Sequence, residues 1–176
     1  MKLQPLDRLD MEQIREWRNE VQNTLRTPYM LTQEMQREYY DNVICNRGST
    51  TRYWAFVEPV LYEASGEEWP EHELMGYGGL ESIEWENSRG EISLLINPDK
   101  RHEGLGREAV AMILEQAFSY LNLNSVHGEC YASGPVPFWQ KIVAEYDAFH
   151  TWLPATKFWQ GKYHQSYYFT FERGEK

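Results

Sequence analysis

The chain has 176 residues, a length typical of one ordinary domain with its own hydrophobic core. Its formal net charge of −10 argues against a large nucleic-acid interface, which needs clustered Lys and Arg, and favours a cationic or neutral ligand. No apolar run approaches the ~18 residues of a membrane span, and the first residues lack an apolar signal segment, so we expect a soluble, cytoplasmic protein with no membrane partner.

The N-terminal part of the chain predicts a short strand and two helices. Residues 2–6 contain Pro5, which an edge strand tolerates and a sheet interior does not. Asp10 is the expected N-cap of the first helix, and Thr32 opens a second helix that continues to about residue 46. The apolar residues of the first helix recur on one side and are Met11, Ile14, Trp17 and Val21.

Two antiparallel strands are expected next. Residues 52–58 and 74–83 have strand composition, and a turn at residues 86–90 leads into the following strand. The acidic connection around residues 65–71 is interpreted as a solvated loop.

The most informative stretch covers residues 91–121. An apolar run over residues 92–96 predicts a buried strand, which ends at Asn97 because Pro98 has no N–H donor. A polar loop then leads to the glycines of residues 104–106, after which apolar residues recur at helical spacing. Because the first turn of a helix carries unpaired N–H groups and a positive dipole end, this strand, glycine loop and helix can bind an anion.

The C-terminal part predicts three further elements. Residues 125–132 form a strand, residues 134–137 start a helix, and residues 166–173 alternate as a terminal strand. The two cysteines, Cys45 and Cys130, are far apart in the sequence and match no metal-ligand spacing, so no metal site is expected.

Residues 101–106, Arg-His-Glu-Gly-Leu-Gly, resemble the pyrophosphate-loop signature of the GNAT acetyltransferases, Arg or Gln-x-x-Gly-x-Gly or Ala. A P-loop would continue with Lys-Ser/Thr, and a Rossmann fingerprint would lack the charged spacer after the strand. Trp17-Arg18-Asn19 and Thr27-Pro28-Tyr29-Met30 resemble the GNAT branch that contains flagellar amino-sugar acetyltransferases and ribosomal-protein amino-terminal acetyltransferases.

The resemblance implies one α/β (α+β) GNAT domain over residues 1–176. Its expected sheet is mixed and mostly antiparallel, with six to seven strands and about four flanking helices. It also implies that the central strand and the strand at residues 125–132 splay apart. The pantetheine arm of acetyl-CoA would lie between them, where unpaired backbone groups can bind it like an added strand.

By the same resemblance, acetyl-CoA is the co-substrate and no metal takes part. The main chain of Leu94, Leu95 and Ile96 would hold the acetyl and pantetheine end. The pyrophosphate would be bound by backbone N–H groups of the glycine loop, with an arginine at each end. The loop residues are Arg101, His102, Glu103, Gly104, Leu105, Gly106 and Arg107.

The family reaction is direct attack of a neutral amine on the thioester, which needs a base for the amine and a proton for the leaving thiolate. Glu129 matches the strand glutamate of the ribosomal branch and is the first candidate base, with Glu91 and Glu81 as alternatives. Arg89 occupies the position of the glutamate in histone-type relatives. His127 shares a strand face with Glu129.

Many relatives protonate the thiolate with a tyrosine on the helix after this strand. Here Gly134 replaces the asparagine of that motif, and Trp139 or Lys141 occupies the tyrosine position. Tyr131 is the candidate substitute. Water is the alternative, because a thiol with a pKa of about 8.5 leaves readily.

We therefore expect an acetyl-CoA-dependent N-acetyltransferase that acts on a small amine or amino sugar. In the related branch the two N-terminal helices overhang the acceptor cleft, so Tyr29, Met30 and Tyr40 are predicted acceptor-side residues, and Glu81 is a further predicted substrate-binding residue. The alternatives are a non-catalytic GNAT-fold binding module, an acetyltransferase of protein amino termini or side chains, and transfer of another acyl group. A homodimer is a further expectation, because many relatives pair through terminal strands.

Overall fold

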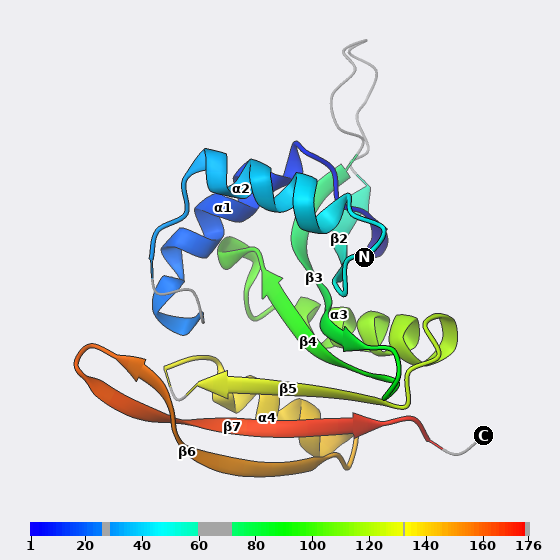
Figure 1. Ribbon diagram of the computed structural model, residues 1–176, viewed down its shortest axis with the longest axis vertical. Helices are drawn as coiled ribbons and strands as arrows, with labels where there is room; N and C mark the ends of the chain where they lie inside the picture. The colour runs from blue at the N-terminus through cyan, green and yellow to red at the C-terminus, as the bar shows by residue number, and fades with distance from the viewer. Residues whose placement is uncertain (26–28, 60–71, 132, 175–176) are drawn as a thin grey trace.

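The computed structural model describes residues 1–25, 29–59, 72–131 and 133–174. Thr27, Pro28 and the predicted acidic loop at residues 65–71 lie outside the described residues. Within the described ranges seven strands form one sheet, in the order β1-β2-β3-β4-β5-β7-β6 (Figure 1). The strands are β1 (Lys2–Pro5), β2 (Arg52–Pro59), β3 (His72–Glu84), β4 (Arg89–Ile96), β5 (Ser125–Tyr131), β6 (Phe149–Trp159) and β7 (Lys162–Glu172).

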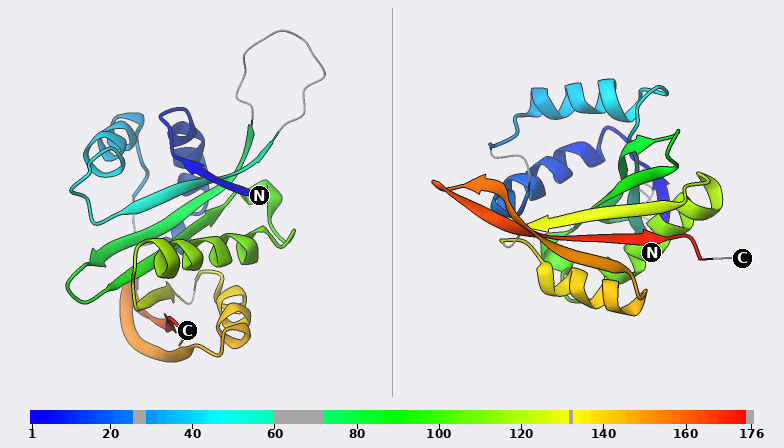
Figure 2. Two further views of the ribbon diagram at one scale, coloured as in Figure 1. Left: turned by 90° about the vertical axis from the view of Figure 1, so that its right-hand side faces the viewer. Right: turned by 60° about the horizontal axis from the view of Figure 1, so that its bottom comes forward.

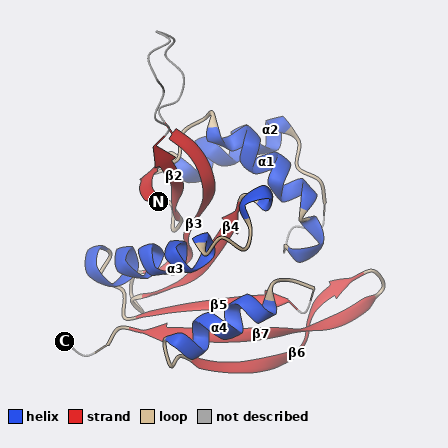
Figure 3. Cartoon of the chain, turned by 180° about the vertical axis from the view of Figure 1, so that it is seen from behind, coloured by secondary structure: helices blue, strands red, loops and turns tan. Residues whose placement is uncertain are grey.

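Helices cover both faces of the sheet. One face carries α1 and α2, and the other carries α3 and α4 (Figures 2 and 3). The helices are α1 (Asp10–Glu20), α2 (Gln33–Tyr39), α3 (Leu105–Glu115) and α4 (Val136–Glu145). Short π-helical turns extend α2 and α3 to residues 44 and 120. In the described part of the chain no helix combines the length and the apolar character needed to cross a bilayer.

The hydrophobic core has two parts, one on each face of the sheet. Ile92 of β4 packs with Val110 and Ile113 of α3 in the larger part, which continues to α4. Leu95 of β4 packs with Ile14 of α1 in the smaller part. Successive side chains of a strand point to opposite faces, so the apolar run of β4 supplies both parts.

Most predicted elements are confirmed, and the start of α1 differs in one detail. Asp10 is the first helical residue, and its carboxylate accepts from the N–H of Asp7 at 3.0 Å, while the side chain that accepts from the first N–H groups of the helix is that of Asp7. Its Oδ1 accepts from the N–H groups of Leu9 at 2.7 Å and Asp10 at 3.0 Å. The prediction of an Asp10 cap was therefore wrong. Thr32 caps α2 as predicted, because its hydroxyl accepts from the N–H of Met35 at 3.2 Å.

Strand β6 is absent from the sequence-based prediction. It is the edge strand of the sheet, and among the described strands it pairs only with β7. It contains Pro154, which lacks an N–H donor and is tolerated at a sheet edge. Most of its residues are exposed, so its sequence lacks the apolar alternation of a half-buried strand. β7 also begins earlier than predicted, at Lys162.

The parallel strands β4 and β5 pair only at their first residues. Their register joins Arg89 with Ser125, Gly90 with Val126 and Glu91 with His127, and it ends there. Beyond this point the two strands diverge, as Figure 1 shows. The predicted splayed strand pair is confirmed.

Candidate active site

The diverging part of β4 presents backbone polar groups toward β5. The N–H of Asn97 donates to the carbonyl of Met75 at 2.9 Å, and the carbonyl oxygen of Leu95 also lies against β3. Backbone groups of successive strand residues point to opposite sides. The N–H and C=O groups of Leu94 and Ile96 are therefore directed into the opening, whereas Leu95 contributes a buried side chain beneath α1.

The facing edge of β5 is built in the same way. The N–H of Arg173 donates to the carbonyl of Asn124 at 2.9 Å, so even-numbered residues of β5 direct their backbone toward β7. The backbone groups of Glu129 and the N–H of Tyr131 are thus directed toward β4, from which no described residue pairs with them, whereas the Tyr131 carbonyl accepts from the N–H of Gly134 at 2.7 Å. Two strand edges with free donors and acceptors suit an amide-rich ligand that binds like an added strand.

The loop between β4 and α3 has the geometry of an anion-binding turn. His102 has a φ of 71° and Gly104 a φ of 86°. The N–H groups of Arg107 and Glu108 both donate to the carbonyl of Gly104, at 3.1 and 3.3 Å. The N–H groups of residues 104–106 donate to no acceptor among the described residues. These three amides, at the positive end of the α3 dipole, are available to a phosphate.

The two glycines of this loop have different roles. Gly104 occupies the left-handed region, and a Cβ there would meet nothing within 4 Å. Gly106 packs on α4, because a Cβ there would lie 3.0 Å from the ring of Phe138. Gly104 thus allows the left-handed backbone conformation of the loop, and Gly106 allows α3 to pack closely against α4.

The arginines of the loop differ in their contacts. The guanidinium of Arg107 makes a bidentate pair with Glu145 of α4, in which Nη2 lies 2.6 Å from Oε1 and Nε lies 2.8 Å from Oε2. This hydrogen-bonded pair lowers the pKa of the Glu145 carboxyl. Arg101, His102 and Glu103 are exposed. Arg107 therefore links two helices although its side chain is 68% exposed, and Arg101 makes no ion pair with a described residue.

The candidate carboxylates gather on the sheet face that α1 and α2 cover. Glu81 and Glu91 are register partners across β3 and β4, and Glu91 is in turn the partner of His127 on β5. Glu129 follows His127 on the same face of β5. Glu91 is buried, and Glu81 accepts a hydrogen bond from the Tyr53 hydroxyl at 2.9 Å. The fold thus brings residues from three strands together beside the opening.

A group of aromatic side chains and one arginine continue this face under α1. Tyr53 and Tyr77 meet edge to face with ring centroids 5.6 Å apart, and Arg18 Nη1 donates to the Tyr77 hydroxyl at 3.3 Å. Burial raises the pKa of Tyr39 to about 12, so this phenol stays neutral. The sequence placed Tyr53 and Tyr77 in predicted strands and Arg18 in a predicted helix, but it gave no signal that these side chains would meet the carboxylates.

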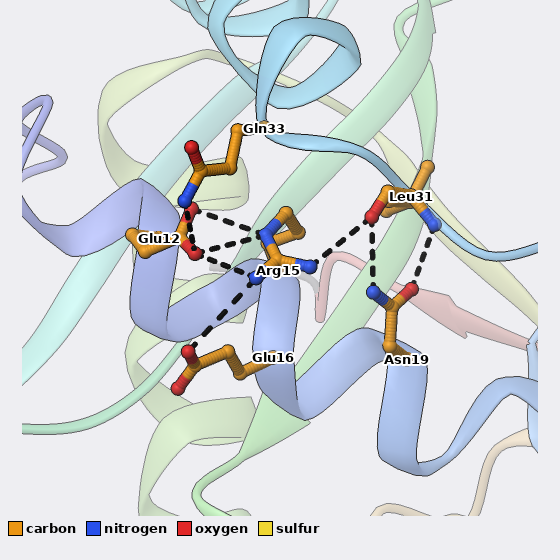
Figure 4. Close-up of polar contacts among 6 residues, drawn as sticks. All are labelled: Glu12, Arg15, Glu16, Asn19, Leu31 and Gln33. Atoms are coloured by element: carbon orange, nitrogen blue, oxygen red, sulfur yellow. Dashed lines mark hydrogen bonds and ion pairs between the residues drawn. The ribbon is translucent and has the colours of Figure 1, made fainter.

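The connection that carries Tyr29 and Met30 is fixed to α1 at Leu31, as Figure 4 shows. The Asn19 side chain pairs with the Leu31 backbone through two hydrogen bonds, of 2.8 and 3.0 Å. Arg15 Nη1 also donates to the Leu31 carbonyl, at 3.2 Å. Asn19 of the Trp-Arg-Asn motif therefore positions the connection, on which Tyr29 and Met30 are 54% and 59% exposed.

Glu129 and Tyr131 each contact a residue of the C-terminal hairpin. The Ser166 hydroxyl donates to Glu129 Oε1 at 2.5 Å. Lys157 Nζ lies 4.6 Å from the centroid of the Tyr131 ring and also donates to the backbone carbonyls of Asn23 and Leu25. The sequence gave no signal for Ser166 or Lys157, because both contacts join residues far apart in the chain.

The helix positions considered for the proton donor lie away from the opening. Trp139 is buried against the opposite face of the sheet, where it stacks on Phe169 with centroids 4.7 Å apart. Lys141 is exposed. Among the candidates, Tyr131 is the one whose strand position borders the opening.

Comparisons with known proteins agree with this architecture. A CoA and spermine complex of spermidine N-acetyltransferase from Vibrio cholerae is similar at a TM-score of 0.78, with 18% identity over 97% of this chain and 94% of that one. A dodecameric structure of spermidine N-acetyltransferase from Vibrio cholerae has a TM-score of 0.72, with 19% identity over 97% of this chain and 92% of the other. At these identities the likeness establishes the fold. A comparison with curated proteins finds no match.

Assignment to a family comes from the sequence itself. The family model described as an acetyltransferase (GNAT) domain matches residues 1–134, which include both N-terminal helices, the glycine loop and β5. The chain therefore belongs to the GNAT acetyltransferase family and is an acetyl-CoA-dependent N-acetyltransferase, as the glycine-loop motif predicted.

Proposed function

We propose that the enzyme acetylates a small, cationic primary amine, with polyamines and amino sugars as the first acceptor classes. The observation that carries this proposal is the group of Glu81, Glu91 and Glu129 beside the splayed strands. Carboxylates attract an ammonium group, and the net charge of −10 adds a long-range attraction. The similar Vibrio cholerae structure is described as a spermidine N-acetyltransferase in complex with CoA and spermine, which supports the polyamine class.

The residues that would hold acetyl-CoA fit its chemistry. Leu94 and Ile96 on one strand edge, with Glu129 and the N–H of Tyr131 on the other, offer backbone partners for the pantetheine amides. The amides of residues 104–106 would take the pyrophosphate, with the Arg101 side chain close to the same turn. When bound, acetyl-CoA supplies the acetyl group as an activated thioester.

In the mechanism that we propose, Glu129 removes a proton from the acceptor ammonium, and the neutral amine attacks the thioester carbonyl. Glu91, one rung further along the sheet face, is the alternative base. As the C–N bond forms the C–S bond breaks, and the second proton of the amine nitrogen passes through Tyr131, or through water, to the departing thiolate. Glu81 and the tyrosines under α1 would orient the acceptor, with Tyr29 and Met30 at its outer side.

An amine panel tests this proposal directly. Purified protein is given acetyl-CoA with a polyamine, an amino sugar, or a peptide with a free amino terminus, and release of the CoA thiol is followed. We expect thiol release with one of the small amines and a loss of about 10²- to 10⁴-fold in kcat/KM for Glu129→Gln. The matched control is Glu86→Gln, at an exposed residue of the turn before β4.

The second candidate function is a non-catalytic binding module, which the placement of Trp139 in the core favours. If the protein is such a module, CoA should raise its melting temperature, and no amine in the panel should cause release of the CoA thiol. If CoA binds but neither the wild-type protein nor the carboxylate variants release thiol with any amine, the catalytic proposal fails and the module remains.

We also propose that the chain forms a homodimer or larger assembly through its C-terminal hairpin. Phe149, Trp152, Phe158 and Tyr163 of β6 and β7 are 42–68% exposed, which is unusual for such large apolar side chains. A similar structure is described as dodecameric. Light scattering of the purified protein gives the mass. A monomer at micromolar concentration would contradict this proposal.

A further inference from the structure

Two hydroxyl groups of the C-terminal hairpin form a chain that ends on Glu129. Thr156 Oγ1 donates to Ser166 Oγ at 2.7 Å, and Ser166 Oγ donates to Glu129 Oε1 at 2.5 Å. A serine hydroxyl has a single proton. Because Ser166 Oγ accepts the hydrogen bond from Thr156, it donates its own single proton to Glu129. Both hydrogen bonds therefore point from Thr156 toward the carboxylate.

The position of Ser166 in the sheet explains why this contact is stable. Ser166 lies opposite Tyr131, and Glu129 lies opposite Tyr168, so Ser166 and Glu129 are diagonal neighbours across β5 and β7. Ser166 is fully buried, with 0% exposure, so water does not compete for its proton. Glu129 Oε2 accepts no hydrogen bond from the described residues and is left for the acceptor amine.

An irregularity in β6 brings Thr156 to this point. Leu153 pairs with Ser166 and Lys157 pairs with His164, so residues 154–156 of β6 stand opposite Gln165 alone. Within this bulge Ala155 has a φ of 54°, a conformation that costs energy for a residue other than glycine. Bulges beside active sites commonly redirect a side chain. Here the bulge directs Thr156 toward Ser166.

We propose that Ser166 and Thr156 are positioning residues for the base of the acetyl transfer. They hold one oxygen of Glu129 so that the other faces the acceptor amine. The C-terminal hairpin is then part of the catalytic machinery as well as the edge of the sheet. This inference rests on the proposed role of Glu129 as the base.

Three variants test this series of hydrogen bonds, and each is assayed with an amine that the panel identifies as an acceptor. Ser166→Ala removes the donor, and we expect kcat to fall about tenfold while the KM for acetyl-CoA is unchanged. Thr156→Val keeps the shape of this exposed side chain and removes its hydroxyl, and we expect kcat to fall about threefold. Thr156→Ser retains a hydroxyl and should restore kcat. Thr151→Val is the matched control, because Thr151 on the same strand donates to no described residue.

The pH profile separates positioning from a purely structural role. Loss of a donor to an ionised carboxylate favours its protonated form, so the acid limb of kcat/KM moves to higher pH in Ser166→Ala. The other titratable groups near Glu129 on this face are His127, Tyr131, Lys157, Tyr168 and Glu91, and all of them are retained in the variant. Thr151→Val should keep the wild-type profile.

A double-mutant cycle with Glu129→Gln completes the test. If Ser166 acts through Glu129, adding Ser166→Ala to Glu129→Gln causes no further loss of kcat. Additive losses, or a wild-type rate and pH profile in both Ser166→Ala and Thr156→Val, would overturn the inference. If Glu129→Gln itself keeps full activity, the assignment of the base fails instead. The two failures are therefore distinguishable.

Discussion

Gly104 and Gly106 stand two residues apart in one motif, and substitutions should act on them through different forces. Gly104→Ala places a Cβ at a φ of 86°, which costs about 1–2 kcal/mol. Gly106→Ala places a Cβ 3.0 Å from the Phe138 ring, which has to move. We expect both variants to weaken CoA binding in a titration, because both displace the amides of the α3 N-terminus.

A compensating substitution tells the two effects apart. Phe138→Leu opens space next to Gly106, so the pair Gly106→Ala and Phe138→Leu should recover CoA affinity. The pair Gly104→Ala and Phe138→Leu should not, because the strain at Gly104 is in the backbone. Equal rescue of both glycine variants would contradict the separate roles.

Lys157 is a buried cation whose contacts are to backbone carbonyls and aromatic rings. Its exposure is 7%, and burial lowers the pKa of its ammonium group. Lys157→Met would leave the carbonyls of Asn23 and Leu25 without this donor, at an expected cost of about 1–3 kcal/mol in the free energy of unfolding. Urea denaturation measures the change. The exposed Lys141 gives the control, since Lys141→Met should change stability little, and equal stability of both variants would refute the role of Lys157.

At the scale of elements, the pair of Arg107 and Glu145 holds the first turn of α3 to the end of α4. Arg107 lowers the pKa of the Glu145 carboxyl below its ordinary value of 4.5. A carboxyl with a lowered folded-state pKa contributes stability above its ordinary value, and this contribution is lost as the pH falls through the lowered value. Arg107→Gln should therefore lower the melting temperature slightly at neutral pH, and the difference should disappear on acidification.

The same pair can be tested without a pH change. Glu145→Gln in the Arg107→Gln background should cause no further loss, because the interaction is already gone. Thermal melts of the four proteins of this cycle give the coupling. A difference from wild type that persists unchanged at low pH would mean that Arg107 stabilises the fold by another contact.

For the whole molecule, the acidic surface should guide cationic acceptors to the opening. With a net charge of −10, kcat/KM for a polyamine should fall as ionic strength rises from about 0.05 to 0.3 M, because salt screens the attraction. A zwitterionic amino acid, whose net charge is zero, is the matched control, and its kcat/KM should depend less on ionic strength. Steady-state rates at several salt concentrations provide the measurement, and equal salt dependence for both acceptors would refute long-range attraction.

The sequence by itself determined the parts of this protein that depend on local patterns. The apolar run over residues 92–96 and Pro98 identify β4 and its end, and the glycines that follow mark the turn into α3. These features were predictable because strand alternation, helix periodicity and glycine conformations are properties of neighbouring residues. The family followed from the same stretch, since its motif is contiguous.

Only the tertiary structure decided which distant side chains meet. Ser166 contacts Glu129 across 37 positions of the chain, and Arg107 reaches Glu145 across 38. Such contacts depend on strand order, on register and on the bulge in β6, and none of these leaves a local pattern. Strand β6 itself was missed because an exposed edge strand buries too little to show alternation. The sequence thus predicts the turn at which acetyl-CoA would bind, and the assembled sheet decides which residues surround that turn, because register is a property of paired strands.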